Sequence, residues 1–325
     1  MLLRTRRKIA LALVCLMLGI GGVALVMHPD KESISFDAVV EIWSSIIRDV
    51  DRFGLTITQI SPAREMEIGE EIDKEVTADY GQPVLSEQAD YVSDVGQALV
   101  PFAERKRINY VFRLVDSPDP NAFALPGGRI YVTTGMLKFA QSEAELAAVL
   151  GHEISHVDLK HCVERLQYEL AARRIAGDDI AGIVSIGYRL VQLGFSEDQE
   201  LEADTNGVIL AAKAGYNPRA AIAVYERLGA LEADRKADEE SQSTPAESNS
   251  QTVAGELGGA LAKSLDDYFA THPPAALRVP SIKKAIERNA AAWRGREFYV
   301  GRRNYAEWRA RSKREFPEER IKFVP

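Results

Sequence analysis

The spacing of apolar positions changes along the chain, and each spacing predicts a different kind of element. Helical spacing covers residues 36–60, 63–81 and 86–105, with a Ser-Pro pair breaking the first two segments apart. The segments 108–116 and 128–135 are instead rich in β-branched and aromatic residues, and the stretch NAFALPGG between them ends in a turn sequence. We therefore expect a small β-sheet after the first helices.

Helical spacing returns after Gln141, and it dominates the rest of the chain. Ser142 and Glu145 have the spacing of a capping box, which predicts the start of a helix carrying GHEISHVDLKH. Further helices are expected over 197–215 and 216–232. The predicted fold class is α+β and mostly α-helical, with one main domain at 36–290.

The first 30 residues form a separate segment. Four basic residues precede an uncharged run at 9–27, which is about long enough to cross a bilayer. A secretory signal has a shorter apolar region and a small-x-small cleavage site, and no clean A-x-A stands before His28. We expect an N-terminal membrane anchor at 1–30, with the basic end in the cytoplasm and the rest of the chain translocated. A cleaved signal and a lipoprotein signal ending at Cys15 are the alternatives.

Composition narrows the classes of function. The net charge is −8, which argues against a nucleic-acid partner because such proteins need a basic surface. Two cysteines cannot build a disulfide framework. The segment at about 233–255 is charged, Ser-rich and poor in apolar residues, so we expect a flexible excursion there. Residues 291–325 are basic with interleaved aromatics, and we expect them to form a C-terminal extension on the domain surface.

Two histidines four residues apart on one helix can aim their imidazoles at one point, and His152 and His156 have this spacing. Glu153 is rotated about 100° from His152, so it would reach a water on the metal instead of the metal. Zinc with three protein ligands keeps an open position and acidifies its bound water. The pattern predicts a zinc-bound water that Glu153 activates.

The third ligand has to come from elsewhere in the chain. His161 is one residue early for a metzincin ligand and, on a continuous helix, would lie about 140° from His156, so it reads as a surface histidine or as support for a ligand. The later stretch EDQELEAD offers Glu200 and Asp204 on one helix face with Gly207, while Glu202 points away. One carboxylate would bind the metal and the other would hold an imidazole N–H, unless this stretch is only a solvated helix start.

Three ordered motifs, GHEISHVDLKH, FSEDQELEAD and THPPAALR, resemble peptidase family M48, which implies a gluzincin-like zinc metallopeptidase domain. The resemblance implies that His152, His156 and Glu200 bind one Zn²⁺. It also implies that Glu153 is the general base and that Asp204 supports a ligand or donates a proton.

The same resemblance extends to two other places. The segment before the active-site helix would supply an edge strand that pairs with extended substrate, which marks Asn121, Ala122, Phe123 and Ala124 as candidate substrate-binding residues. The chain has Glu197 where the family usually has arginine, a change that alters the local charge but removes no ligand.

The resemblance also implies that His272 in THPP lies near the zinc. There it would donate a hydrogen bond to the oxyanion or, in a resting state, occupy the fourth position on the metal. A capping or packing histidine is the alternative.

The resulting prediction is a membrane-anchored zinc metalloendopeptidase in the periplasm of a bacterial cell envelope, cleaving unfolded or misassembled envelope proteins. Secretion into the periplasm is the alternative location. A prenyl-protein (CAAX) protease fits less well, because the only other long apolar stretch, 181–195, is about 15 residues long and contains Arg189. A chaperone or adaptor with a latent metal site is the hypothesis from another class.

Overall fold

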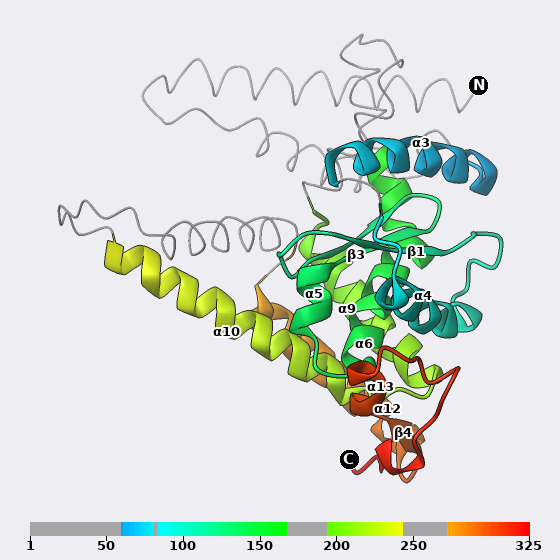
Figure 1. Cartoon of the computed structure of the whole chain (residues 1–325). Helices are drawn as coiled ribbons and strands as arrows, with labels where there is room; N and C mark the ends of the chain where they lie inside the picture. Colours follow the sequence, from blue (N-terminus) through cyan, green and yellow to red (C-terminus); the bar gives the residue numbers. More distant parts are fainter. Residues whose placement is uncertain (1–59, 81–82, 168–193, 243–271, 273) are drawn as a thin grey trace, which may run out of the picture. The chain divides into compact units, whose positions relative to one another are not determined.

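The computed structural model describes residues 60–80, 83–167, 194–242, 272 and 274–325, all of which belong to one unit, 57–325 (Figure 1). The expectation of a mostly helical α+β fold is confirmed there. The helices are α3 (Pro62–Tyr80), α4 (Glu87–Leu99), α5 (Thr134–Phe139), α6 (Glu143–Asp158), α9 (Glu197–Lys213), α10 (Arg219–Gln242), α12 (Ala275–Trp293) and α13 (Arg302–Ala306), and the strands are β1 (Val111–Val115), β2 (Ala122–Leu125), β3 (Arg129–Thr133), β4 (Glu297–Tyr299) and β5 (Arg320–Lys322).

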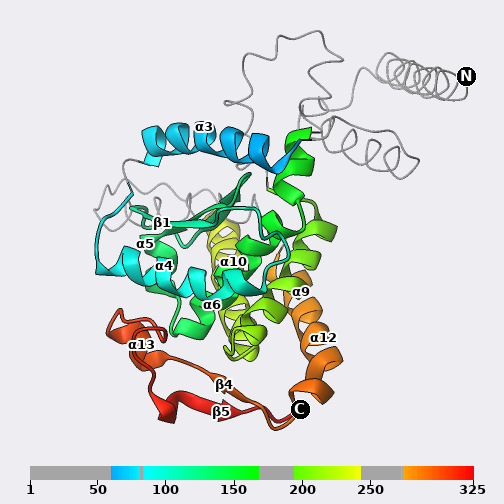
Figure 2. The same cartoon turned by 90° about the vertical axis from the view of Figure 1, so that its right-hand side faces the viewer.

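The predicted small sheet has the order β1-β3-β2, with β1 parallel and β2 antiparallel to β3. Alternate residues of strand β2 point to opposite faces of the sheet, as expected of a β-strand. Ala122 and Ala124 pack into the main core beneath α6, whereas Phe123 and Leu125 join a second cluster with helix α3. The sheet is thus a middle layer between α3 and the other helices (Figure 2).

Helix α6 is the centre of the main layer, and every residue in it is buried. It packs against α4, α9, α10 and β2. Its start differs in one detail from the predicted capping box. The Ser142 hydroxyl accepts from the Glu145 N–H as expected, but the Glu145 carboxylate accepts from the backbone of Gln141 instead of Ser142. A complete capping box is present at α9, between Ser196 and Gln199.

The extension expected at 291–325 packs on the domain with most of its charges exposed, and its aromatic rings lie deeper than a surface position predicts. Strands β4 and β5 pair antiparallel, and Trp293, Phe298 and Phe323 pack edge to face inside the main core. The interleaved aromatics explain the difference, because burying such large rings stabilises a core more than solvating them would. These residues complete the domain.

The flexible excursion expected from residue 233 does not begin there. Helix α10 continues to Gln242, ten residues into that segment. The reason is that ADRKADEE, although poor in apolar residues, consists largely of strong helix formers.

Several expectations lie outside the described residues: the anchor at 1–30, the helix at 36–59, most of the apolar stretch at 181–195, and the excursion after 242. In the part of the chain that is described, no helix is both long and apolar enough to cross a membrane.

Candidate metal centre

The candidate centre forms where helices α6 and α9 cross. A Cβ built on Gly207 would lie 2.7 Å from the backbone nitrogen of His152 and 2.9 Å from the carbonyl carbon of Gly151. Only glycine permits this approach of two helix backbones. The crossing brings the histidine pair of α6 against the first turns of α9.

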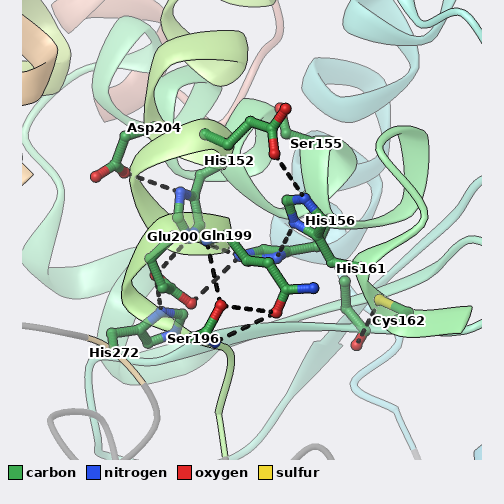
Figure 3. A network of polar contacts seen from close by, with 12 residues as sticks. His152, Ser155, His156, His161, Cys162, Ser196, Gln199, Glu200, Asp204 and His272 are labelled. Carbon is green, nitrogen blue, oxygen red and sulfur yellow. Dashed lines mark hydrogen bonds and ion pairs between the residues drawn. The ribbon is translucent and has the colours of Figure 1, made fainter. Parts of the chain in front are cut away.

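The three expected ligands converge on one another (Figure 3). Nε2 of His152 lies 3.1 Å from Nε2 of His156 and 3.3 Å from Oε2 of Glu200, and Nε2 of His156 lies 3.4 Å from Oε1 of Glu200. Zinc with tetrahedral nitrogen and oxygen ligands at about 2.0–2.1 Å would place its ligand atoms about 3.3 Å apart. Each pair of groups therefore has a contact at about this spacing, with Oε2 of Glu200 facing His152 and Oε1 facing His156.

His272 lies at the same cluster. Its Nδ1 is 2.9 Å from Oε2 of Glu200, and its ring centroid is 5.5 Å from that of His152. Ligand atoms of His152, Glu200 and His272 all lie within 4.8 Å of one another, so this group could hold a metal ion.

Asp204 occupies the position expected for a group that holds a ligand histidine. Its Oδ1 is 2.9 Å from Nδ1 of His152, on the side of the ring opposite Glu200. With the hydrogen on Nδ1 directed to Asp204, Nε2 of His152 is the nitrogen that faces His156 and Glu200.

Arg278 is a site residue that the sequence reasoning missed. Its guanidinium donates from Nε and Nη2 to the two carboxylate oxygens of Asp204, at 3.0 and 2.7 Å, and lies over the Tyr225 ring at 4.0 Å. The signal was present, because Arg278 closes the THPPAALR motif. It also shares a helix face with the buried Ile282 and Ala285, where an arginine needs a partner.

Glu153 is buried, and its Oε2 has no hydrogen-bond partner among the described residues. Burial raises the pKa of Glu153 to about 8. Oε1 of Glu200 is likewise buried without a hydrogen bond in the described part of the chain. Buried oxygens of this kind require a water or a cation, so the donor set fits a metal ion.

Electrostatics keeps the two carboxylates ionised and divides the three imidazoles into two kinds. Burial opposes ionisation of Glu200 and Asp204, but neighbouring histidines and Arg278 outweigh it and lower the pKa of both. Burial lowers the pKa of His156 and of His272. Burial and Arg278 also act to lower the pKa of His152, but Asp204 and Glu200 raise it to about 9.

His161 is not a surface histidine, which corrects one of the two expectations for it. It is buried, and its Nδ1 lies 3.1 Å from Nδ1 of His156. The extrapolation along a continuous helix was wrong because α6 ends at Asp158 and Lys160 has a φ of 69°. This left-handed residue turns the chain and directs His161 back toward His156.

Residues 86–286 match the model of peptidase family M48, which is more than half of the chain. The chain belongs to this family. Similar relatives include the mitochondrial metalloendopeptidase OMA1 of Arabidopsis thaliana, 36% identical over 60% of this chain and 35% of the relative. Metalloprotease LoiP of Escherichia coli is 32% identical over 51% of this chain and 68% of the relative. A putative beta-barrel assembly-enhancing protease of Vibrio cholerae is 31% identical over 45% of this chain and 34% of the relative. The chain thus spans about a third of the length of two of these relatives.

The M48 region runs from the N-cap turn of α4 into α12, and it includes all of the residues at the candidate centre. Strand β2, expected to pair with substrate, is an edge strand of the sheet, and its residues are buried. Asn121 donates its backbone N–H to Thr133 of the paired strand β3, and the Ala124 carbonyl receives a 3.7 Å contact from the Cys162 thiol. The candidate substrate residues thus lie on an edge already partly covered.

Glu197, which stands where the family usually has arginine, is solvent-exposed. Glu197 is the first residue of α9, where an acidic side chain is favourable at the helix N-terminus. It contributes no atom to the cluster of donor atoms described above.

Proposed function

We propose that this chain is a zinc-dependent metalloendopeptidase, with His152, His156 and Glu200 as the zinc ligands. The convergence of the two Nε2 atoms and the Glu200 carboxylate, with contacts of 3.1–3.4 Å, carries the proposal. Zinc, when bound there, would polarise the scissile carbonyl and acidify a water molecule.

The chain's own residues supply the proton transfers. Glu153 takes the proton of the attacking water and returns it to the leaving amine, a role that suits its raised pKa of about 8. Asp204 keeps the hydrogen of His152 on Nδ1, and Arg278 keeps Asp204 ionised. Asn121, Ala122, Phe123 and Ala124 would pair with an extended polypeptide once the β2 edge is accessible.

The proposed substrates are unfolded or misassembled envelope proteins, and the proposed location is the bacterial inner membrane facing the periplasm. The relative from Vibrio cholerae, whose name refers to beta-barrel assembly, and the apolar run at 9–27 support this assignment.

Casein digestion by the purified full chain tests the peptidase assignment. Wild type should cleave casein, a chelator should abolish cleavage, and Glu153→Gln should reduce the rate about 10²–10⁴-fold while still binding zinc. Chelator-insensitive cleavage, or equal cleavage by Glu153→Gln, would refute it.

The contact between His272 and Glu200 favours a second candidate, in which the metal site is held closed and proteolysis is latent. A His272 that occupies a metal position would block the water, so His272→Ala would then cleave casein faster than wild type. If His272 instead donates a hydrogen bond to the oxyanion, His272→Ala should lower kcat about 10²–10³-fold with little change in KM.

A further inference from the structure

A chain of three side chains leads from the candidate metal centre to the protein surface. His156 faces Glu200 with Nε2, and its Nδ1 lies 3.1 Å from Nδ1 of His161 (Figure 3). Nε2 of His161 is 3.5 Å from the carboxylate of Glu202, whose side chain is 63% exposed. These contacts are distinct from those of Asp204, which holds the other histidine.

Only one placement of hydrogens satisfies all three groups when His156 binds a cation. Ligation through Nε2 requires the hydrogen of His156 to be on Nδ1. That hydrogen can be donated to His161 only if Nδ1 of His161 carries none, so the hydrogen of His161 is on Nε2. There it faces the carboxylate of Glu202, which is an acceptor.

The local backbone is shaped to make this contact. Lys160 adopts a φ of 69°, a left-handed conformation that is unfavourable for a residue other than glycine. The turn brings His161 to the edge of the His156 ring, while Phe195 stacks on its face at a centroid distance of 3.8 Å. His156 is thus held by a stacked ring and by one hydrogen-bond acceptor.

We propose that His161 is a positioning residue that fixes the tautomer and ring orientation of His156 for zinc binding, and that Glu202 orients His161. This inference rests on the proposed function, since it assigns His156 as a ligand. The two ligand histidines are then held by different means. His152 is fixed by an ionised carboxylate tied to Arg278, and His156 by a neutral imidazole whose far nitrogen faces an exposed carboxylate.

Zinc affinity of the full chain, measured by competition with a chelator of known affinity, tests the proposal. His161→Phe keeps a planar ring but has no acceptor, and it should bind zinc about 10–100-fold more weakly. His161→Asn offers a carbonyl oxygen in place of Nδ1, and it should recover most of that loss. Glu202→Gln should give a smaller loss of about 2–5-fold, and Asp198→Asn, an exposed acid on the same helix, should give none.

Two further measurements distinguish a positioning role of His161 from a packing role. Thermal unfolding of the metal-free proteins shows whether each variant folds, and the visible absorption of the Co²⁺-loaded proteins reports the ligand geometry. We expect the Co²⁺ spectrum to change in His161→Phe and to return toward wild type in His161→Asn.

Wild-type zinc affinity in His161→Phe would overturn the inference and leave the peptidase assignment intact. Equal losses in the Phe and Asn variants would also overturn it, because they would assign His161 a packing role. A wild-type chain that bound no zinc would instead refute the proposed function, and this inference with it.

Discussion

A cluster around a buried glutamate lies at each end of helix α6: Glu143 begins the helix, and Glu200 of α9 packs near its other end. The two clusters differ in the hydrogen bonds that the carboxylate oxygens accept. At the start of α6, Glu143 accepts hydrogen bonds from the hydroxyls of Tyr91 and Tyr216, at 3.1 and 2.8 Å, and from the Arg311 N–H at 3.0 Å. Toward its other end, Glu200 faces imidazole nitrogens, and its Oε1 has no hydrogen bond from the described residues.

The difference separates a structural carboxylate from a functional one. Around Glu143 every contacting group is a donor, so the cluster is complete as it stands. Around Glu200 the Nε2 atoms of His152 and His156 point at each other and at the carboxylate, an arrangement that needs a shared proton or cation. Burial alone does not distinguish the two, because Glu143 and Glu200 are both fully buried.

The largest expected effect is on activity, from Glu200→Gln. The amide keeps the shape of the side chain but removes the negative charge that a zinc ligand supplies, so hydrolysis of a quenched peptide should fall at least about 1,000-fold. Zinc content should fall with it, and urea unfolding of the metal-free protein should change little. A variant with full activity would show that the two clusters are alike.

Glu143→Leu should have the opposite effects: it should lower stability and leave zinc binding nearly unchanged. It leaves two hydroxyls and one N–H without an acceptor, and we expect it to lower the free energy of unfolding by about 3 kcal/mol. Zinc affinity of the folded fraction should stay within about twofold of wild type. Glu87→Leu is the matched control, because Glu87 opens α4 after the N-cap Ser86 but is exposed, and it should cost less than about 0.5 kcal/mol. Lost zinc binding in Glu143→Leu would mean that the Glu143 cluster is also needed to form the metal centre.

The same comparison explains how much of the molecule could be predicted from sequence. His152 and His156 are one helical turn apart, and so are Glu200 and Asp204, so helix periodicity alone places each pair on one face. The Glu143 cluster draws its partners from α4, from the turn after α9 and from the C-terminal segment, and no periodicity relates them.

Arg278 was not predicted, and for His161 the sequence left open a surface position and support for a ligand, for related physical reasons. The partner of Arg278 lies 74 positions away in the sequence, and only the packing of α12 against α9 brings the two together. His161 depends on a single left-handed residue, which helical extrapolation cannot foresee. Local spacing therefore predicts which residues share a face, and tertiary packing decides what that face meets.

Gly207→Ala should have a smaller effect, on both stability and metal binding. The added methyl group meets the backbone of α6 at His152, so the two helices must separate slightly, at a cost of about 1–3 kcal/mol. Because Glu200 and the histidines lie on opposite sides of that crossing, zinc affinity should weaken as well. Thr205→Ala, two residues earlier on α9, is the control for both measurements. Unchanged zinc affinity in a destabilised Gly207→Ala would show that the crossing supports the fold but does not set the ligand spacing.

The smallest expected effect is on the pH dependence of the free energy of unfolding, to which Glu143 and Glu200 should contribute differently. Burial raises the pKa of Glu143, and the hydrogen bonds from Arg311, Tyr216 and Tyr91 oppose this without cancelling it. A raised folded pKa means that the folded chain holds the proton more tightly. The contribution of Glu143 to stability is then fully present below the unfolded pKa of about 4.3 and is lost as the pH rises through the folded value.

Urea unfolding of the metal-free wild type and Glu143→Gln between pH 4.5 and pH 8 measures this dependence. The amide does not titrate, so the free energy of wild type relative to the variant should decrease with rising pH, by at most about 1.4 kcal/mol per pH unit. Glu200 has a lowered pKa, so above about pH 6 its carboxylate is ionised in both the folded and the unfolded state and itself contributes no slope. A difference for Glu143 that grew with pH would mean that its hydrogen bonds outweigh burial, and that the cluster at the start of α6 stabilises a charge.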